Sequence, residues 1–123
     1  MKIITQFFGF IFLIAFFLTA QSVSAQNPLK VAPKAFKEKL DNAQVNVLEY
    51  MSKPGDKEAM HSHPDILIYV IHGGKLKSTT PDGKSQVIEY KTGDVVWRPS
   101  LTHSIENVGT TEVKALLVEV KKK

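Results

Sequence analysis

Two histidines separated by a single residue, His61 and His63, are the part of the sequence best suited to chemistry. Alternate residues of a β-strand point to the same side, so a strand through this tripeptide places two imidazole rings side by side. Imidazole is the commonest metal ligand in proteins, and two adjacent rings can chelate one ion. The competing interpretation is a solvated pair at a sheet edge, since exposed histidines are ordinary surface residues.

The absence of cysteine narrows the chemistry further. It excludes a disulfide framework, a thiolate metal site and a cysteine nucleophile. A small domain without disulfides depends on its hydrophobic core, on a bound metal or on self-association. Metal ligation also contributes folding free energy, so a histidine site would help to hold the domain together. The same reasoning favours a homodimer, in which a second copy covers an exposed sheet face.

The segments that must position these histidines are short strands separated by tight turns. Pro81-Asp82-Gly83 is typical of a hairpin turn, because proline presets φ and glycine accepts a positive φ. The apolar run from Ile66 to Ile71 predicts a strand that is buried on both faces. About eight short antiparallel strands without a long helix predict an all-β sandwich or barrel; the expected strands are 45–51, 59–63, 66–71, 75–80, 84–90, 95–98, 102–107 and 112–120.

The N-terminal segment predicts export. Lys2 precedes an apolar run of 12 residues, Phe7 to Leu18, and Val23-Ser24-Ala25 has the small residues of a cleavage site. An uncleaved anchor is the alternative, but a spanning helix needs about 20 apolar residues. We therefore expect a periplasmic or secreted protein with no membrane attachment after cleavage. The chain divides into a signal peptide (1–25), an N-terminal extension (26–42), a β-barrel domain (43–120) and a basic tail (121–123).

Within the extension, Phe36, Leu40 and Ala43 have the spacing of one face of a short helix. The net charge of +4 is modest, and no stretch interleaves basic with aromatic residues as a nucleic-acid groove would. A nucleic-acid partner is therefore not expected, and a small-molecule ligand or substrate is.

Glycine and proline around the histidines complete two longer motifs. Gly55-x5-His61-x-His63 resembles the first signature of the cupin superfamily. The resemblance implies a double-stranded β-helix, which is a small jelly-roll barrel, with a metal ion in its mouth. It also implies that His61 and His63 are metal ligands on one strand.

The second signature begins at Gly93. Gly93-x5-Pro99-x3-His103-x3-Asn107 resembles the downstream cupin motif, and the two signatures together span residues 55–107. The resemblance implies that His103 is the third metal ligand. The chain is thus similar to the small, single-domain cupins.

The sequence departs from the family at a metal-ligand position. Cupins usually carry a glutamate three or four residues after the second histidine, where this chain has Ile66 and Leu67. Counting back from Gly73 selects Ile66, whereas counting back from Gly74 selects Leu67. Neither side chain can bind a metal. The second signature also has Leu101 where glycine is common.

Three nearby carboxylates are candidates to replace that glutamate. Asp65 follows the second histidine by two residues, yet Pro64 interrupts the strand, so a turn role is favoured over ligation. Glu58 and Glu106 stand an odd number of residues from the nearest histidine and are expected to face away from it. Three neutral imidazoles leave a divalent ion with a net charge of about +2, which favours an anion or a deprotonated water.

The remaining notable residues have ordinary structural interpretations. His72 precedes a glycine turn and is expected at the surface, and Tyr69 and Trp97 are expected in the core. Arg98 either meets an anionic ligand or ends a strand. Asn107 is expected to bond to backbone in a turn.

The function expected from these residues is binding of one divalent transition-metal ion by His61, His63 and His103. Imidazole suits several metals, so Fe, Mn, Zn, Ni and Cu all stay open. One hypothesis is a metal-dependent enzyme, oxygenase-like or isomerase-like, although no residue stands out as a catalytic acid or base. The alternative is a non-catalytic barrel that binds a small ligand or metal, and a third is a structural barrel without metal.

Overall fold

The computed structural model of the protein describes residues 26–123. The predicted signal peptide, residues 1–25, lies outside the described residues. Within the described part of the chain, no helix has the length and apolar character needed to cross a membrane.

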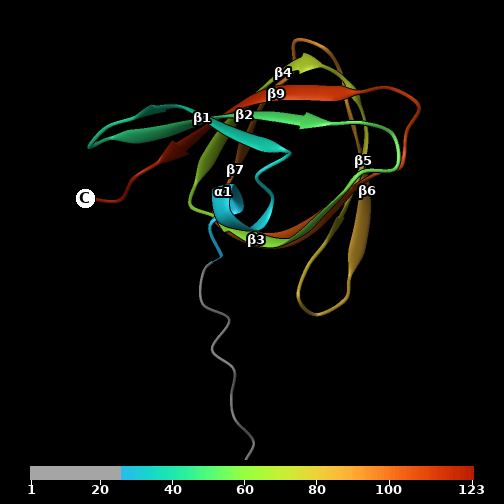
Figure 1. The fold of residues 1–123 in the computed structure, drawn as a ribbon, viewed down its shortest axis with the longest axis horizontal. Helices are drawn as coiled ribbons and strands as arrows, with labels where there is room; N and C mark the ends of the chain where they lie inside the picture. Colours follow the sequence, from blue (N-terminus) through green and yellow to red (C-terminus); the bar gives the residue numbers. More distant parts are fainter. Residues whose placement is uncertain (1–25) are drawn as a thin grey trace, which may run out of the picture.

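The described chain is a barrel of nine antiparallel strands in two facing sheets, with one short helix before them (Figure 1). One sheet has five strands in the order β1-β2-β9-β4-β7, and the other has four in the order β3-β8-β5-β6. This confirms the predicted all-β double-stranded β-helix. The elements are α1 (Pro28–Val31), β1 (Phe36–Asp41), β2 (Val45–Ser52), β3 (Lys57–His63), β4 (Ile66–His72), β5 (Gly74–Thr79), β6 (Ser85–Tyr90), β7 (Val95–Arg98), β8 (Leu101–Asn107) and β9 (Val113–Val120).

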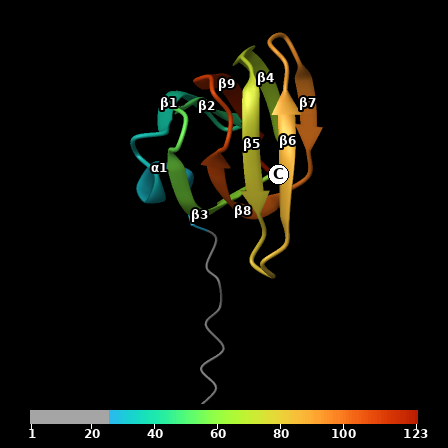
Figure 2. The ribbon, with the colours of Figure 1, turned by 90° about the vertical axis from the view of Figure 1, so that its right-hand side faces the viewer.

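The two sheets enclose the core between them. In Figure 1, β2 and β9 run across the top of the barrel and β3 lies along its lower side. Figure 2 shows the β5–β6 and β4–β7 pairs closing one end. Inward-facing side chains from both sheets form one apolar cluster, which includes Phe36, Leu48, Ile66, Ile105 and Leu117.

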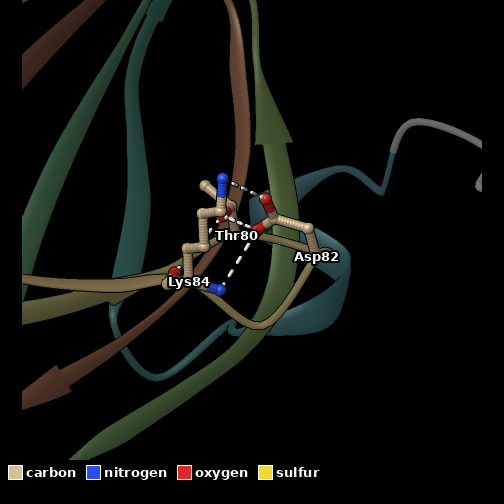
Figure 3. A network of polar contacts seen from close by, with 3 residues as sticks. All are labelled: Thr80, Asp82 and Lys84. Carbon is tan, nitrogen blue, oxygen red and sulfur yellow. Dashed lines mark hydrogen bonds and ion pairs between the residues drawn. The ribbon is translucent and has the colours of Figure 1, made fainter.

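The predicted hairpin turn is confirmed between β5 and β6, and it is held by Asp82 (Figure 3). The Asp82 carboxylate accepts hydrogen bonds from the Thr80 hydroxyl and from the Lys84 amide, the latter at 3.1 Å, and pairs with the Lys84 ammonium at 3.8 Å. Gly83 adopts a φ of 85°, a conformation that side-chain-bearing residues rarely take. The turn fixes the register of the two strands that it joins.

The helix expected over residues 36–43 is wrong. Phe36–Asp41 is instead strand β1, which pairs with β2 in the register Phe36↔Tyr50. Phe36 is buried whereas Leu40 is exposed, so the two apolar side chains do not share a buried face. The free edge of β2 decides the outcome, because strand pairing overrides a weak local preference.

Strand β4 is apolar on both sides, yet the chain itself buries only one of them. Ile66 and Val70 point into the core, whereas Leu67, Tyr69 and Ile71 are exposed on the outer side of the sheet. The expectations of burial on both faces and of a core position for Tyr69 are therefore wrong for a single chain. The core position expected for Trp97 is wrong for the same reason, because it lies beside Leu67 on this outer face.

Candidate metal centre

The barrel brings His61, His63 and His103 together in its interior. One ring nitrogen from each lies within 4.8 Å of the others. The ring centroid of His61 lies 4.9 Å from that of His63 and 4.8 Å from that of His103. His61 and His63 are buried, and His103 is partly buried. The spacing between the three rings suits the ligation of a single ion.

Local strand geometry explains this convergence. His61 and His63 stand two residues apart on β3, so both point inward. His103 lies on β8 directly opposite His61 in the antiparallel pair. Directly opposite residues share one face of a sheet with Cβ atoms about 5 Å apart, which is the separation that two ligands of one ion need.

Hydrogen bonds to Nδ1 orient two of the three rings. His61 Nδ1 donates to the carbonyl oxygen of Ala59 at 2.8 Å, which leaves Nε2 without a proton. That Nε2 atom is buried and has no hydrogen-bond partner among residues 26–123. His103 Nδ1 lies 2.9 Å from the Ser78 hydroxyl oxygen. Metal-binding histidines usually engage their second nitrogen in this way, so the rings fit a metal ion.

The electrostatic setting keeps two of the rings in the form that binds metal. Burial lowers the pKa of His61 to about 4. Burial is the main cause that lowers the pKa of His103 to about 3, and electrostatic repulsion from the nearby His61, His63 and Arg98 side chains adds to it. Both imidazoles are therefore neutral at neutral pH, and a neutral imidazole has the free lone pair that ligation requires.

The three histidines line a mostly apolar cavity of about 60 Å³, together with Phe36 and Tyr50. The Phe36 ring lies 5.1 Å from the His61 ring and 5.7 Å from the His63 ring, so β1 covers the site. A second cavity of about 40 Å³ adjoins it on the side of β7, and His103 lines both. Arg98 lines the second cavity, so its charge lies close to the histidines.

Ile66, and not Leu67, occupies the inward position at which cupins usually carry the glutamate ligand. Ile66 is 2% exposed and lines the cavity, whereas Leu67 is 38% exposed on the outer face. Asp65 does not join the histidine cluster, since its carboxylate accepts a hydrogen bond from the Ser100 amide at 2.8 Å. Glu106 faces outward as expected and lies 3.8 Å from the Lys57 ammonium.

Glu58 departs from its expected orientation. It is buried opposite Ile105, a residue that lines the histidine cavity. A β-bulge explains the change: Glu58 precedes His61 by three positions on β3, whereas their partners on β8 are only two positions apart. The extra residue reverses the alternation, so both side chains face inward. Burial raises the pKa of Glu58 to about 6, although the nearby hydroxyl groups of Ser52 and Tyr50 counteract part of the rise.

Glu119 is a buried carboxylate that the sequence analysis missed. It continues the inward row Val113, Ala115, Leu117 on β9, and it sits directly opposite Ile66 on β4. Its Oε2 atom lies 3.7 Å from His63 Nδ1. The strict alternation of β9 was the available signal, because it places this acid on the same side as the apolar residues.

Two other polar residues have the structural roles that the sequence indicated. Asn107 is buried, and its side-chain amide donates to the carbonyl oxygens of Ser52 and Thr111, both at 2.9 Å. His72 is exposed and lies away from the cluster, with Nδ1 2.5 Å from the Glu112 carbonyl oxygen.

Comparison with known proteins agrees with this fold. The profile of the cupin domain family matches residues 48–119. A cupin domain from Bordetella pertussis, known from its crystal structure, is 28% identical and superimposes with a TM-score of 0.65 over 71% of this chain and 92% of its own. No curated protein matches the sequence.

More distant structures share the fold alone. A conserved protein with a double-stranded β-helix domain from Klebsiella pneumoniae is 24% identical, with a TM-score of 0.55 over 69% of this chain and 70% of its own. The polyketide cyclase RemF from Streptomyces resistomycificus is 18% identical, with a TM-score of 0.53 over 71% and 64%. Because the family profile covers more than half of the chain and the barrel agrees with it, this protein belongs to the cupin superfamily.

Proposed function

We propose that this chain is an exported cupin in which His61, His63 and His103 hold one divalent transition-metal ion and expose it to a small anionic molecule. The observation that carries the proposal is the convergence of three imidazoles, with the buried Nε2 of His61 left without a partner. A buried polar atom without a partner costs free energy, so its retention favours a ligand at this point. A bound divalent ion would supply Lewis acidity and lower the pKa of a coordinated water.

The charges around the site favour an anion. Three neutral imidazoles do not offset the charge of a divalent ion, and the Ile66 position contributes no carboxylate. Arg98 adds a positive charge close enough to lower the pKa of His103. The cavity of about 60 Å³ has room for only a few water-sized groups. A ligand of a few atoms, or the anionic end of a longer one, suits this space.

Two polar groups beside the cavity support an enzymatic role over simple capture. Tyr50 lines the cavity, and its buried hydroxyl makes no hydrogen bond of good geometry within residues 26–123. Glu58 lies close to it with a pKa raised to about 6. A carboxyl group that titrates near neutral pH is suited to accept and return a proton, and Tyr50 is placed to contact a bound molecule.

The alternative is a non-catalytic barrel that captures a small ligand or metal. The aliphatic lining, with Ile66 at the usual carboxylate position, favours this alternative. The identity of the native metal separates the two roles. Iron or copper would favour oxygen chemistry, whereas zinc would favour a hydrolytic or structural role.

Metal content and anion affinity test the proposed function. Elemental analysis of protein purified without added metal is expected to give about one transition-metal ion per chain. In the cobalt-loaded protein, azide should alter the visible absorption spectrum. Arg98→Gln should weaken azide binding about fivefold, since one nearby charge contributes about 1 kcal/mol.

Lys84→Gln is the matched control, because it removes a positive charge from the β5–β6 turn and should leave azide binding unchanged. A protein that takes up no metal after reconstitution would contradict the metal site. Equal azide affinity in the wild type and in Arg98→Gln would contradict the assignment of Arg98 to anion binding.

A further inference from the structure

The position of Glu119 requires an explanation that fold stability does not supply. Glu119 is 7% exposed, and it ends an otherwise apolar inward row of β9. A buried carboxylate without a partner costs several kcal/mol. Among the described residues, the ion-pairing group within 4 Å of Glu119 is His63 Nδ1, at 3.7 Å.

His63 is the histidine whose second nitrogen has no other partner. His61 Nδ1 bonds to the Ala59 carbonyl oxygen, and His103 Nδ1 lies in hydrogen-bond distance of Ser78. His63 Nδ1 is buried and makes no hydrogen bond within residues 26–123. His63 therefore lacks the orienting partner that His61 and His103 have. The nearest group that could take this role is the Glu119 carboxylate.

Resting on the proposed metal site, we propose that Glu119 is a positioning residue for His63. Its carboxylate accepts a hydrogen bond from the His63 Nδ1 proton, which directs Nε2 toward the metal position. The 3.7 Å separation needs to shorten by less than 1 Å to reach hydrogen-bond length. A rotation of the glutamate side chain supplies that movement.

The same carboxylate lies beside the inward position where Ile66 provides no ligand, and it offsets only part of the charge of a bound ion because it stands behind His63. Ile66 and Glu119 are direct cross-strand neighbours on the inner face of the sheet, so their Cβ atoms lie about 5 Å apart. Glu119 therefore acts on the site from β9, through His63. The carboxylate is not among the atoms that lie within 4.8 Å of one another in the cluster, so its place is behind the ligand.

Zinc affinity and the protonation of His63 test this role. Zinc is the probe because it is diamagnetic, so ¹⁵N NMR of the histidine rings can be recorded on the loaded protein. In the wild type we expect the His63 proton on Nδ1. Glu119→Ala should weaken zinc binding by about 10- to 100-fold. Glu119→Gln should recover part of the affinity, because its amide oxygen still accepts the hydrogen bond.

Glu106→Gln is the matched control, since it removes an outward carboxylate from β8 and should change zinc affinity less than twofold. If Glu119→Ala binds zinc like the wild type, or if zinc-loaded His63 carries its proton on Nε2, the positioning role is wrong. Loss of an oxygen ligand from the X-ray absorption spectrum in Glu119→Gln would instead make Glu119 a direct ligand. A wild type that binds no zinc overturns the proposed metal site itself.

Discussion

Replacing His103 with alanine is expected to empty the metal site and to remove the stabilisation that metal gives the fold. Two imidazoles remain, which is too few to hold a divalent ion against water. His61→Ala and His63→Ala should have the same effect. The losses should not add in double variants, because the first replacement already empties the site. Elemental analysis and the difference in melting temperature between metal-loaded and chelator-treated protein measure the effect.

His72→Ala is the control for these variants. His72 lies outside the cluster and is exposed, so the metal content should not change. Its contact with the Glu112 carbonyl oxygen contributes at most about 1 kcal/mol, so the melting temperature should fall slightly with and without metal. Full metal occupancy in His61→Ala and His103→Ala, or an empty site in His72→Ala, would contradict the assignment.

Acid should affect the metal-free protein through the same residues. The pKa values of His61 and His103 are lowered to about 4 and about 3 in the fold, from about 6.5 in an unfolded chain. As pH falls below about 6.5, the unfolded chain binds protons that the fold excludes, so stability decreases until the folded-state pKa values are reached. Each histidine contributes at most about 1.4 kcal/mol per pH unit in this window. Urea unfolding of the chelator-treated protein should show this decrease, and His103→Ala should reduce its slope.

The strands and the His61–His63 pair were predictable from local spacing. His103 was predictable only from the resemblance to the second cupin motif, because the pairing of β8 with β3 brings it to the site. Two-residue alternation on β3 and glycine-rich turns between apolar runs are visible in the sequence. The spacing of Phe36 and Leu40 led to the wrong prediction of a helix, because it fits a helix face as well as a strand. Only the free edge of β2 selects a strand there, and that edge belongs to the tertiary structure.

The carboxylates near the site were harder to predict, for a physical reason. A single-residue bulge turns Glu58 inward, and no turn residue in the sequence indicates that bulge. Glu119 lies 56 positions from His63 in the chain, and only the pairing of β9 with β4 brings it to the site. Counting along the chain could not separate Ile66 from Leu67, whereas the pleat of β4 separates them at once.

Ile66→Glu is expected to create a four-ligand site, and Leu67→Glu is its matched control. Ile66 lines the cavity beside the histidines, so a carboxylate there can reach the metal and lower the net charge of the site. Metal affinity should rise at least tenfold, measured by chelator competition. Without metal, a carboxyl group in this apolar setting should destabilise the fold by about 3 kcal/mol. Leu67 points outward, so the same change there should leave metal affinity unchanged.

The neighbouring Glu119 carboxylate also affects the Ile66→Glu variant, and a double variant separates the two effects. Two carboxylates on directly opposed positions of β4 and β9 repel each other when both are ionised. Ile66→Glu combined with Glu119→Gln removes that repulsion, so the metal-free double variant should be more stable than Ile66→Glu alone. Its metal affinity should still exceed that of Glu119→Gln, because the new carboxylate binds the ion directly. If Leu67→Glu tightens metal binding and Ile66→Glu does not, the inward face of β4 does not border the metal position, and the site lies elsewhere in the barrel.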